Sequence, residues 1–99
     1  MFDVLADANR RRILDLLRED ERSVGDIVDR LGISQPAVSK HLRVLREAGV
    51  VTARVDAQRR MYRLRPEALR EVDDWLRPYR AAWRDRLDAL ERHLDEQPD

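Results

Sequence analysis

The chain has 99 residues, the size of one small domain, and its 20 basic and 20 acidic side chains cancel in formal charge. Hydrophobic residues make up 42% of it, which is too many for a disordered chain, yet no apolar run is long enough to cross a membrane. Cysteine is absent, which excludes disulfides, thiolate metal sites and cysteine-based redox sensing.

The N-terminal third of the chain predicts two helices. Residues 2–5 form a short apolar start, and Ile13 and Leu17 belong to a helical stripe within residues 8–18. Residues 19–22 are read as a charged connection. No basic segment precedes a long apolar one at the N-terminus, so we expect no signal peptide and a cytoplasmic location.

Residues 23–48 predict two further helices joined by a glycine turn. Ser23 is placed as the N-cap of the first helix, which Gly32 ends. Ser34 is placed as the N-cap of the second, with Pro36 in the first turn, where its missing N–H costs little. Two short helices joined by a tight glycine turn are typical of a helix-turn-helix.

The second of these helices has two different faces. Val38, Leu42 and Leu45 recur at i, i+4 and i+7 and form a stripe that must be buried. Small, polar and basic side chains project away from the stripe, an arrangement that suits the major groove of DNA. The DNA contacts predicted on this helix are Ser34, Gln35, Ser39, Lys40 and Arg43. The alternative is an ordinary solvated helix face.

Residues 50–65 predict a wing, which is a strand hairpin following a helix-turn-helix. Strands are expected over 50–55 and 60–65, with a loop lacking glycine between them. Arg59 and Arg60 at its tip are predicted to reach a minor groove or phosphates, although a plain exposed hairpin would look the same.

Charge is unevenly distributed along the chain. Residues 34–65 carry eight basic side chains and two acidic ones, whereas the segments before and after them are net acidic. A local basic patch is the electrostatic footprint expected of a surface that binds nucleic acid.

Residues 67–96 predict two C-terminal helices, with a break or kink at Arg77 because Pro78 follows it. The second helix carries a near-heptad apolar seam, which is more apolar surface than a small monomer needs. We therefore expect a dimer interface made by Phe2, Leu5, Tyr79, Trp83, Leu87, Leu90 and Leu94. A ligand pocket lined by Trp75 and Trp83 is the alternative. Residues 97–99 are expected to fray.

Three segments carry a family resemblance: LADANRRRIL at 5–14, SQPAVSKHL at 34–42 and LREAGVV at 45–51. In this order and spacing the chain resembles the ArsR family of winged helix-turn-helix repressors. Residues 75–87 are similar to its SdpR-type autorepressors, a branch without metal ligands. The resemblance implies a mainly α fold with a small β-hairpin over residues 1–99, in the order α-α-α-α-β-β-α-α. It also implies a homodimer, formed through the N- and C-terminal helices, that binds an inverted repeat in a promoter and represses transcription.

The chain departs from the metal-sensing members of that family. Residues 24–29, where many members carry a thiol motif, contain no cysteine. His93 and Glu96 supply half of a second metal motif, but Ala82 stands where another histidine would fall. We therefore expect no metal, no cofactor and no enzymatic activity. A winged-helix module that binds another protein, or a metal-responsive repressor, remain the alternatives.

Overall fold

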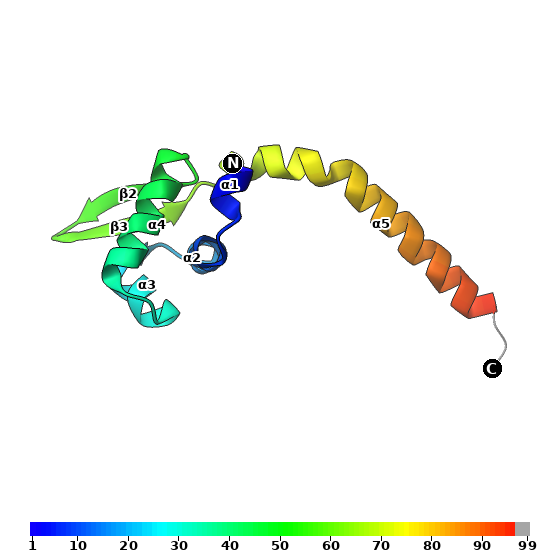
Figure 1. The fold of residues 1–99 in the computed structure, drawn as a ribbon, viewed down its shortest axis with the longest axis horizontal. Coiled ribbons are helices and arrows are strands. Elements are labelled where there is room, and N and C mark those ends of the chain that lie inside the picture. The colour runs from blue at the N-terminus through cyan, green and yellow to red at the C-terminus, as the bar shows by residue number, and fades with distance from the viewer. Residues whose placement is uncertain (97–99) are drawn as a thin grey trace.

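A computed structural model describes residues 1–96, so the expected fraying of residues 97–99 lies outside the described residues. Helices, strands and one 3-10 turn follow each other in a winged helix-turn-helix order. They are α1 (Phe2–Leu5), α2 (Ala8–Glu19), β1 (Arg22–Ser23), α3 (Val24–Leu31), α4 (Gln35–Glu47), β2 (Val51–Asp56), β3 (Arg59–Leu64), η1 (Pro66–Leu69) and α5 (Arg70–Glu96). The sheet projects from one side of a helical body and α5 leaves from the other (Figure 1).

Local capping residues set the bounds of α3 and α4, as the sequence predicts. The Ser23 hydroxyl accepts a hydrogen bond from the Asp26 N–H at 3.2 Å, and the Ser34 hydroxyl accepts one from the Ala37 N–H at 3.3 Å. Gly32 ends α3 with a φ of +70°, in the left-handed region that favours glycine. The caps therefore limit the connection between α3 and α4 to a short turn.

An apolar core joins α2, α3 and α4 to the base of the sheet. The most deeply buried side chains are Ile13, Ile27, Val38, Leu42, Leu45, Val50 and Val51. Three of them form the predicted stripe of α4, and all three are completely inaccessible to solvent. Burial of this stripe fixes the rotation of α4, so its polar and basic face is directed outward.

The sheet is antiparallel and has three strands in the order β1-β3-β2. In the register, Tyr62 of β3 pairs with Ala53 of β2 and with Arg22 of β1. The strand β1 corrects the prediction of a plain connection over residues 19–22. Two residues are too few to show a hydrophobic period, and only pairing with β3 makes them a strand.

The wing hairpin turns at Ala57 and Gln58, with Asp56 pairing with Arg59 across it. Ala57 has a φ of +57° and is the only described non-glycine residue with a positive φ. An L-residue in this region is strained by contact of its Cβ with the backbone, at a cost of about 1–2 kcal/mol.

Replacing Ala57 with glycine is expected to stabilise the fold by about 0.5–1 kcal/mol. Glycine removes the Cβ strain, although part of the gain is lost to the greater freedom of the unfolded chain. Urea unfolding followed by circular dichroism measures the change. Gln58→Gly is the control, because Gln58 has no positive φ and should gain nothing. Equal stabilisation by both variants would contradict the strain.

Of the break or kink predicted at Arg77, the break is wrong, because residues 70–96 form one helix rather than two. The helix α5 runs from Arg70 to Glu96 with Pro78 inside it, and the chain changes helix type earlier, at the end of η1. A proline in a helix removes one hydrogen bond and bends the axis without necessarily ending it. Asp74, whose carbonyl would accept that bond, is exposed to water, and Figure 1 shows α5 curving along its length.

The second half of α5 extends away from the body. Residues 81–96 are all exposed, and the molecule measures 64 Å along its longest axis. Its radius of gyration is 18.8 Å, whereas a compact domain of this length has about 13 Å.

Within residues 1–96 no helix combines the length and the apolar character needed to cross a membrane.

Candidate nucleic-acid interface

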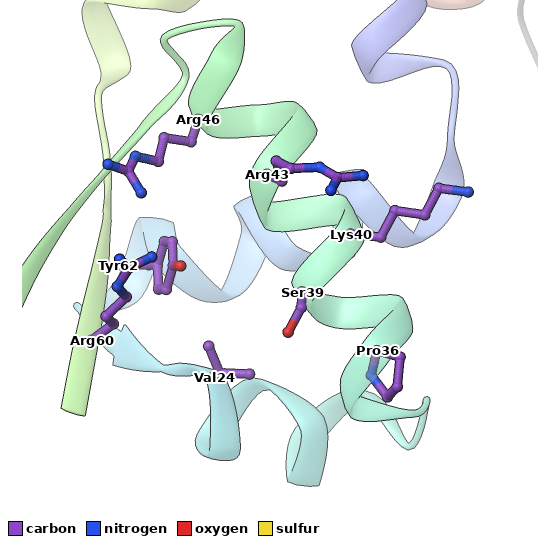
Figure 2. Close-up of a pocket in the computed structure, with 8 residues that line it drawn as sticks. All are labelled: Val24, Pro36, Ser39, Lys40, Arg43, Arg46, Arg60 and Tyr62. Carbon is purple, nitrogen blue, oxygen red and sulfur yellow. The ribbon is translucent and has the colours of Figure 1, made fainter. Parts of the chain in front are cut away.

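A groove of about 580 Å³ separates α4 from the wing (Figure 2). Its lining residues are Val24, Pro36, Ser39, Lys40, Arg43, Arg46, Arg60 and Tyr62. Four of these eight side chains are basic and none is acidic. The groove is therefore a concave, positively charged surface.

Two elements supply the basic side chains of the groove. Lys40, Arg43 and Arg46 follow one another at intervals of three residues on the outward face of α4. Arg60 comes from β3, on the same face of the strand as the buried Tyr62. In Figure 2, Arg46 and Arg60 project toward the space between helix and strand, whereas Lys40 and Arg43 carry their charged ends outward from α4.

The positive charge of the groove is not neutralised by neighbouring side chains. Within residues 1–96, neither the three basic residues of α4 nor Arg60 forms an ion pair. By contrast, Arg54 on the wing pairs with Glu21, and Arg65 just after it pairs with Glu67. Arg54 and Arg65 both lie outside the groove lining. The positive charge of the groove therefore remains available to an anion.

The predicted site residues do not all lie in this groove. It brings together Ser39, Lys40, Arg43 and Arg60. Ser34 and Gln35 are exposed at the start of α4, where the Ser34 hydroxyl is occupied by capping the helix. Arg59 is not in the lining of the groove and borders instead, together with Arg60, a second hollow at the start of α3.

Arg46 is a groove residue absent from the predicted set. It follows Arg43 by three residues, so its position on the outward face could be found from spacing alone. Within residues 1–96, Arg46 forms no ion pair. Arg46 therefore joins the candidate interface.

His41 lies on the side of α4 that meets the start of α2. Its side chain is 14% exposed, and its Nε2 lies 4.0 Å from an Asp7 carboxylate oxygen. Asp7 caps α2 by accepting hydrogen bonds from the N–H groups of Asn9 and Arg10 at 2.8 and 3.1 Å. The bond from Arg10, with help from Asn9 and His41, lowers the pKa of Asp7. His41 thus belongs to helix packing rather than to the groove.

Three consecutive arginines at the start of α2 hold backbone carbonyls. Arg10 donates to Val4 O at 2.6 Å, Arg11 to Leu5 O at 2.6 Å, and Arg12 to Leu31 O at 3.2 Å. These bonds join α1 and the end of α3 to α2, so the arginines have a structural role.

The seam predicted for dimerisation is exposed along α5. Tyr79, Trp83, Leu87, Leu90 and Leu94 are all large apolar side chains open to solvent. At the N-terminal end of the seam, the centroid of the Trp75 ring lies 5.0 Å from that of Tyr79 and 5.4 Å from that of Phe2.

Two residues add detail to this predicted surface. Trp75, absent from the predicted interface, is 53% exposed and continues the seam toward α1. Leu5 is half-buried against the core. An apolar hollow of about 340 Å³ adjoins the seam where α1, α2 and α5 meet, with Leu5, Leu14, Leu69, Val72 and Leu76 in its lining.

Within residues 1–96, no cluster of three or more histidine, cysteine, aspartate or glutamate side chains is arranged to hold a metal ion.

Comparison with known proteins identifies the family of this fold. The family described as "Bacterial regulatory protein, arsR family" matches residues 7–53, which include both helices of the helix-turn-helix. The transcriptional repressor SdpR of Bacillus subtilis (strain 168) is 34% identical over 76 residues, which cover 77% of this chain and 84% of SdpR. The chain belongs to the ArsR family of bacterial regulatory proteins. The chain covers 64% of the length of a second relative and 61% of the length of a third.

Solved structures of ArsR-family proteins share the fold. A possible transcriptional regulator for arsenical resistance is 35% identical, with a TM-score of 0.69. The match covers 98% of this chain and 95% of the chain of that regulator. The homodimeric winged helix-turn-helix DNA-binding domain of Mb0332 from Mycobacterium bovis is also 35% identical, with a TM-score of 0.64 over 69% of this chain and 64% of its own. This ArsR-family chain is thus a transcriptional regulator with a winged helix-turn-helix DNA-binding domain.

Proposed function

We propose that this regulator is a cytoplasmic repressor that binds an inverted-repeat operator as a homodimer. The observation that carries the proposal is the groove between α4 and the wing, whose four basic side chains form no ion pair with any residue from 1 to 96. Phosphate groups are the partners that such a groove suits best, because each neutralised phosphate releases a condensed counterion.

In the proposed complex, α4 enters the major groove. Lys40 and Arg43, whose charged ends point outward, contact guanine edges or phosphates, and Gln35 and Ser39 contact neighbouring base edges. Ser34 holds the start of the helix and adds a phosphate contact. These contacts supply sequence specificity.

Between α4 and the wing, the groove receives the sugar–phosphate backbone that separates the major groove from the next minor groove. Arg46 and Arg60 approach this space from opposite sides, so both can contact one strand. Arg59, near the tip of the wing and outside the groove lining, is left for the flanking minor groove or its phosphates. These contacts supply register and affinity.

The exposed seam of α5 supports the homodimer. A lone amphipathic helix with tryptophan and leucine open to water is unfavourable, because each such side chain gains about 1.5–3 kcal/mol when buried. Pairing α5 and α1 of two copies would cover Phe2, Trp75 and the seam. A two-fold dimer would present its two α4 helices to successive major grooves, about 34–36 Å apart.

Selection of bound sequences from random duplex DNA, followed by salt titration, tests this function. Each dimer would bring eight basic side chains to the two grooves, so affinity for the selected duplex should fall about 10³–10⁵-fold between about 50 and 200 mM salt. Fluorescence anisotropy measures the slope. A flat response, or no enrichment of an inverted repeat, would contradict the proposal.

A further inference from the structure

A bidentate ion pair lies on the outer face of the sheet, opposite the groove. The Arg54 Nε donates to Glu21 Oε2 at 3.1 Å, and the Arg54 Nη2 donates to Glu21 Oε1. Two parallel bonds from a planar guanidinium fix the direction of approach as well as the distance.

This pair joins segments that the backbone does not connect directly. Glu21 precedes β1, Arg54 lies on β2, and the middle strand β3 runs between them. In the register, Met61 of β3 pairs with both Ser23 and Arg54, so the ion pair crosses over the central strand. It ties the wing to the connection between α2 and α3.

The rest of the wing has little support of this kind. β1 is only two residues long, and residues 54–60 are all exposed. A two-stranded ribbon without a packed face is marginally stable in its orientation. The angle of the wing sets how far Arg60 on β3 stands from Arg46 on α4, and thus the width of the groove.

The sign of the charge separates two roles for Glu21. The Glu21 carboxylate, beside the basic wing, repels DNA and also neutralises Arg54. If electrostatic attraction were all that mattered, removing Glu21 would strengthen DNA binding. If the ion pair orients the wing before DNA arrives, removing it would weaken binding, because the complex must then order the wing.

We propose that Glu21 is a positioning residue that, through Arg54, holds the wing at the angle the DNA backbone requires. The inference rests on the proposed DNA-binding function and adds a residue that does not itself touch DNA.

Glu21→Gln tests the inference on the duplex selected by the wild-type chain. We expect affinity to fall about threefold per protomer and about tenfold per dimer, although the variant is more positively charged. Hydroxyl-radical footprinting should lose protection at the flanks, where the wing binds, and keep it at the centre. Exchange of the two residues, Glu21→Arg with Arg54→Glu, restores the pair at constant charge and should recover most of the affinity.

Two further variants make the result decisive. Arg54→Lys keeps the charge but loses the two-bond geometry, so it should also weaken binding. Glu67→Gln, the matched control, removes one acid from a pair that joins residues only two apart and should leave flank protection intact. Equal or tighter binding by Glu21→Gln, with wild type binding normally, would overturn this inference alone. Failure of the wild-type chain to bind any duplex would overturn the proposed function and this inference with it.

Discussion

Replacing Lys40 and Arg43 together with alanine is expected to abolish sequence-specific DNA binding and leave the protein folded. Both side chains are exposed on α4, and within residues 1–96 neither forms an ion pair. A good contact from such a side chain to a base edge is worth about 1–3 kcal/mol, and a dimer loses four of them. The total is comparable to the whole difference between specific and non-specific binding, about 4–10 kcal/mol.

Fluorescence anisotropy on the selected duplex and a scrambled one measures this loss, and thermal unfolding checks the fold. The control is Arg84→Ala with Arg92→Ala, which removes two charges from the part of α5 that projects away from the groove. The control should retain specific binding. Unchanged operator affinity in the Lys40 and Arg43 variant would mean that α4 is not the recognition helix.

Trp83→Glu is expected to convert the dimer to a monomer. Trp83 lies within the exposed seam, and 55% of its surface is accessible in the single chain. Loss of its burial from both copies removes about 3–6 kcal/mol, and the added carboxylates must also be desolvated. The dissociation constant of the dimer should rise at least a hundredfold, because each tenfold change corresponds to about 1.4 kcal/mol.

Analytical ultracentrifugation over a range of concentrations measures the dissociation constant. Ala81→Glu is the matched control, because it adds the same charge to the same helix, two residues away on a different face. DNA affinity should fall with Trp83→Glu because the two α4 helices would no longer bind as one unit. A Trp83→Glu protein that remains dimeric, or a wild-type chain that is a stable monomer, would contradict the proposed interface.

Local signals account for the parts of the fold that the sequence predicts well. Ser23 and Ser34 cap α3 and α4, and Gly32 adopts the left-handed conformation between them. Each feature depends on atoms within a few residues, so it can be read from the chain directly. The stripe of α4 is equally readable, and the outward face follows from it.

Interactions between distant residues account for what the sequence does not reveal. Glu21 and Arg54 are separated by 33 positions, and only the strand order brings their side chains together. The strand β1 has no pattern of its own and exists because β3 offers it hydrogen-bonding partners. Pro78 indicates a break locally, yet the long α5 continues through it and bends.

The helix-turn-helix, the hairpin, the basic segment and the family can all be predicted from the chain, because caps, hydrophobic period and charge are properties of neighbouring residues. Which basic side chains share a groove depends instead on the packing of elements that are distant in the chain. Arg46 and Arg60 lie 14 positions apart on different elements, and they meet because burial rotates α4 while strand pairing sets the faces of β3. Arg59, adjacent to Arg60 in the chain, is not in the lining of that groove.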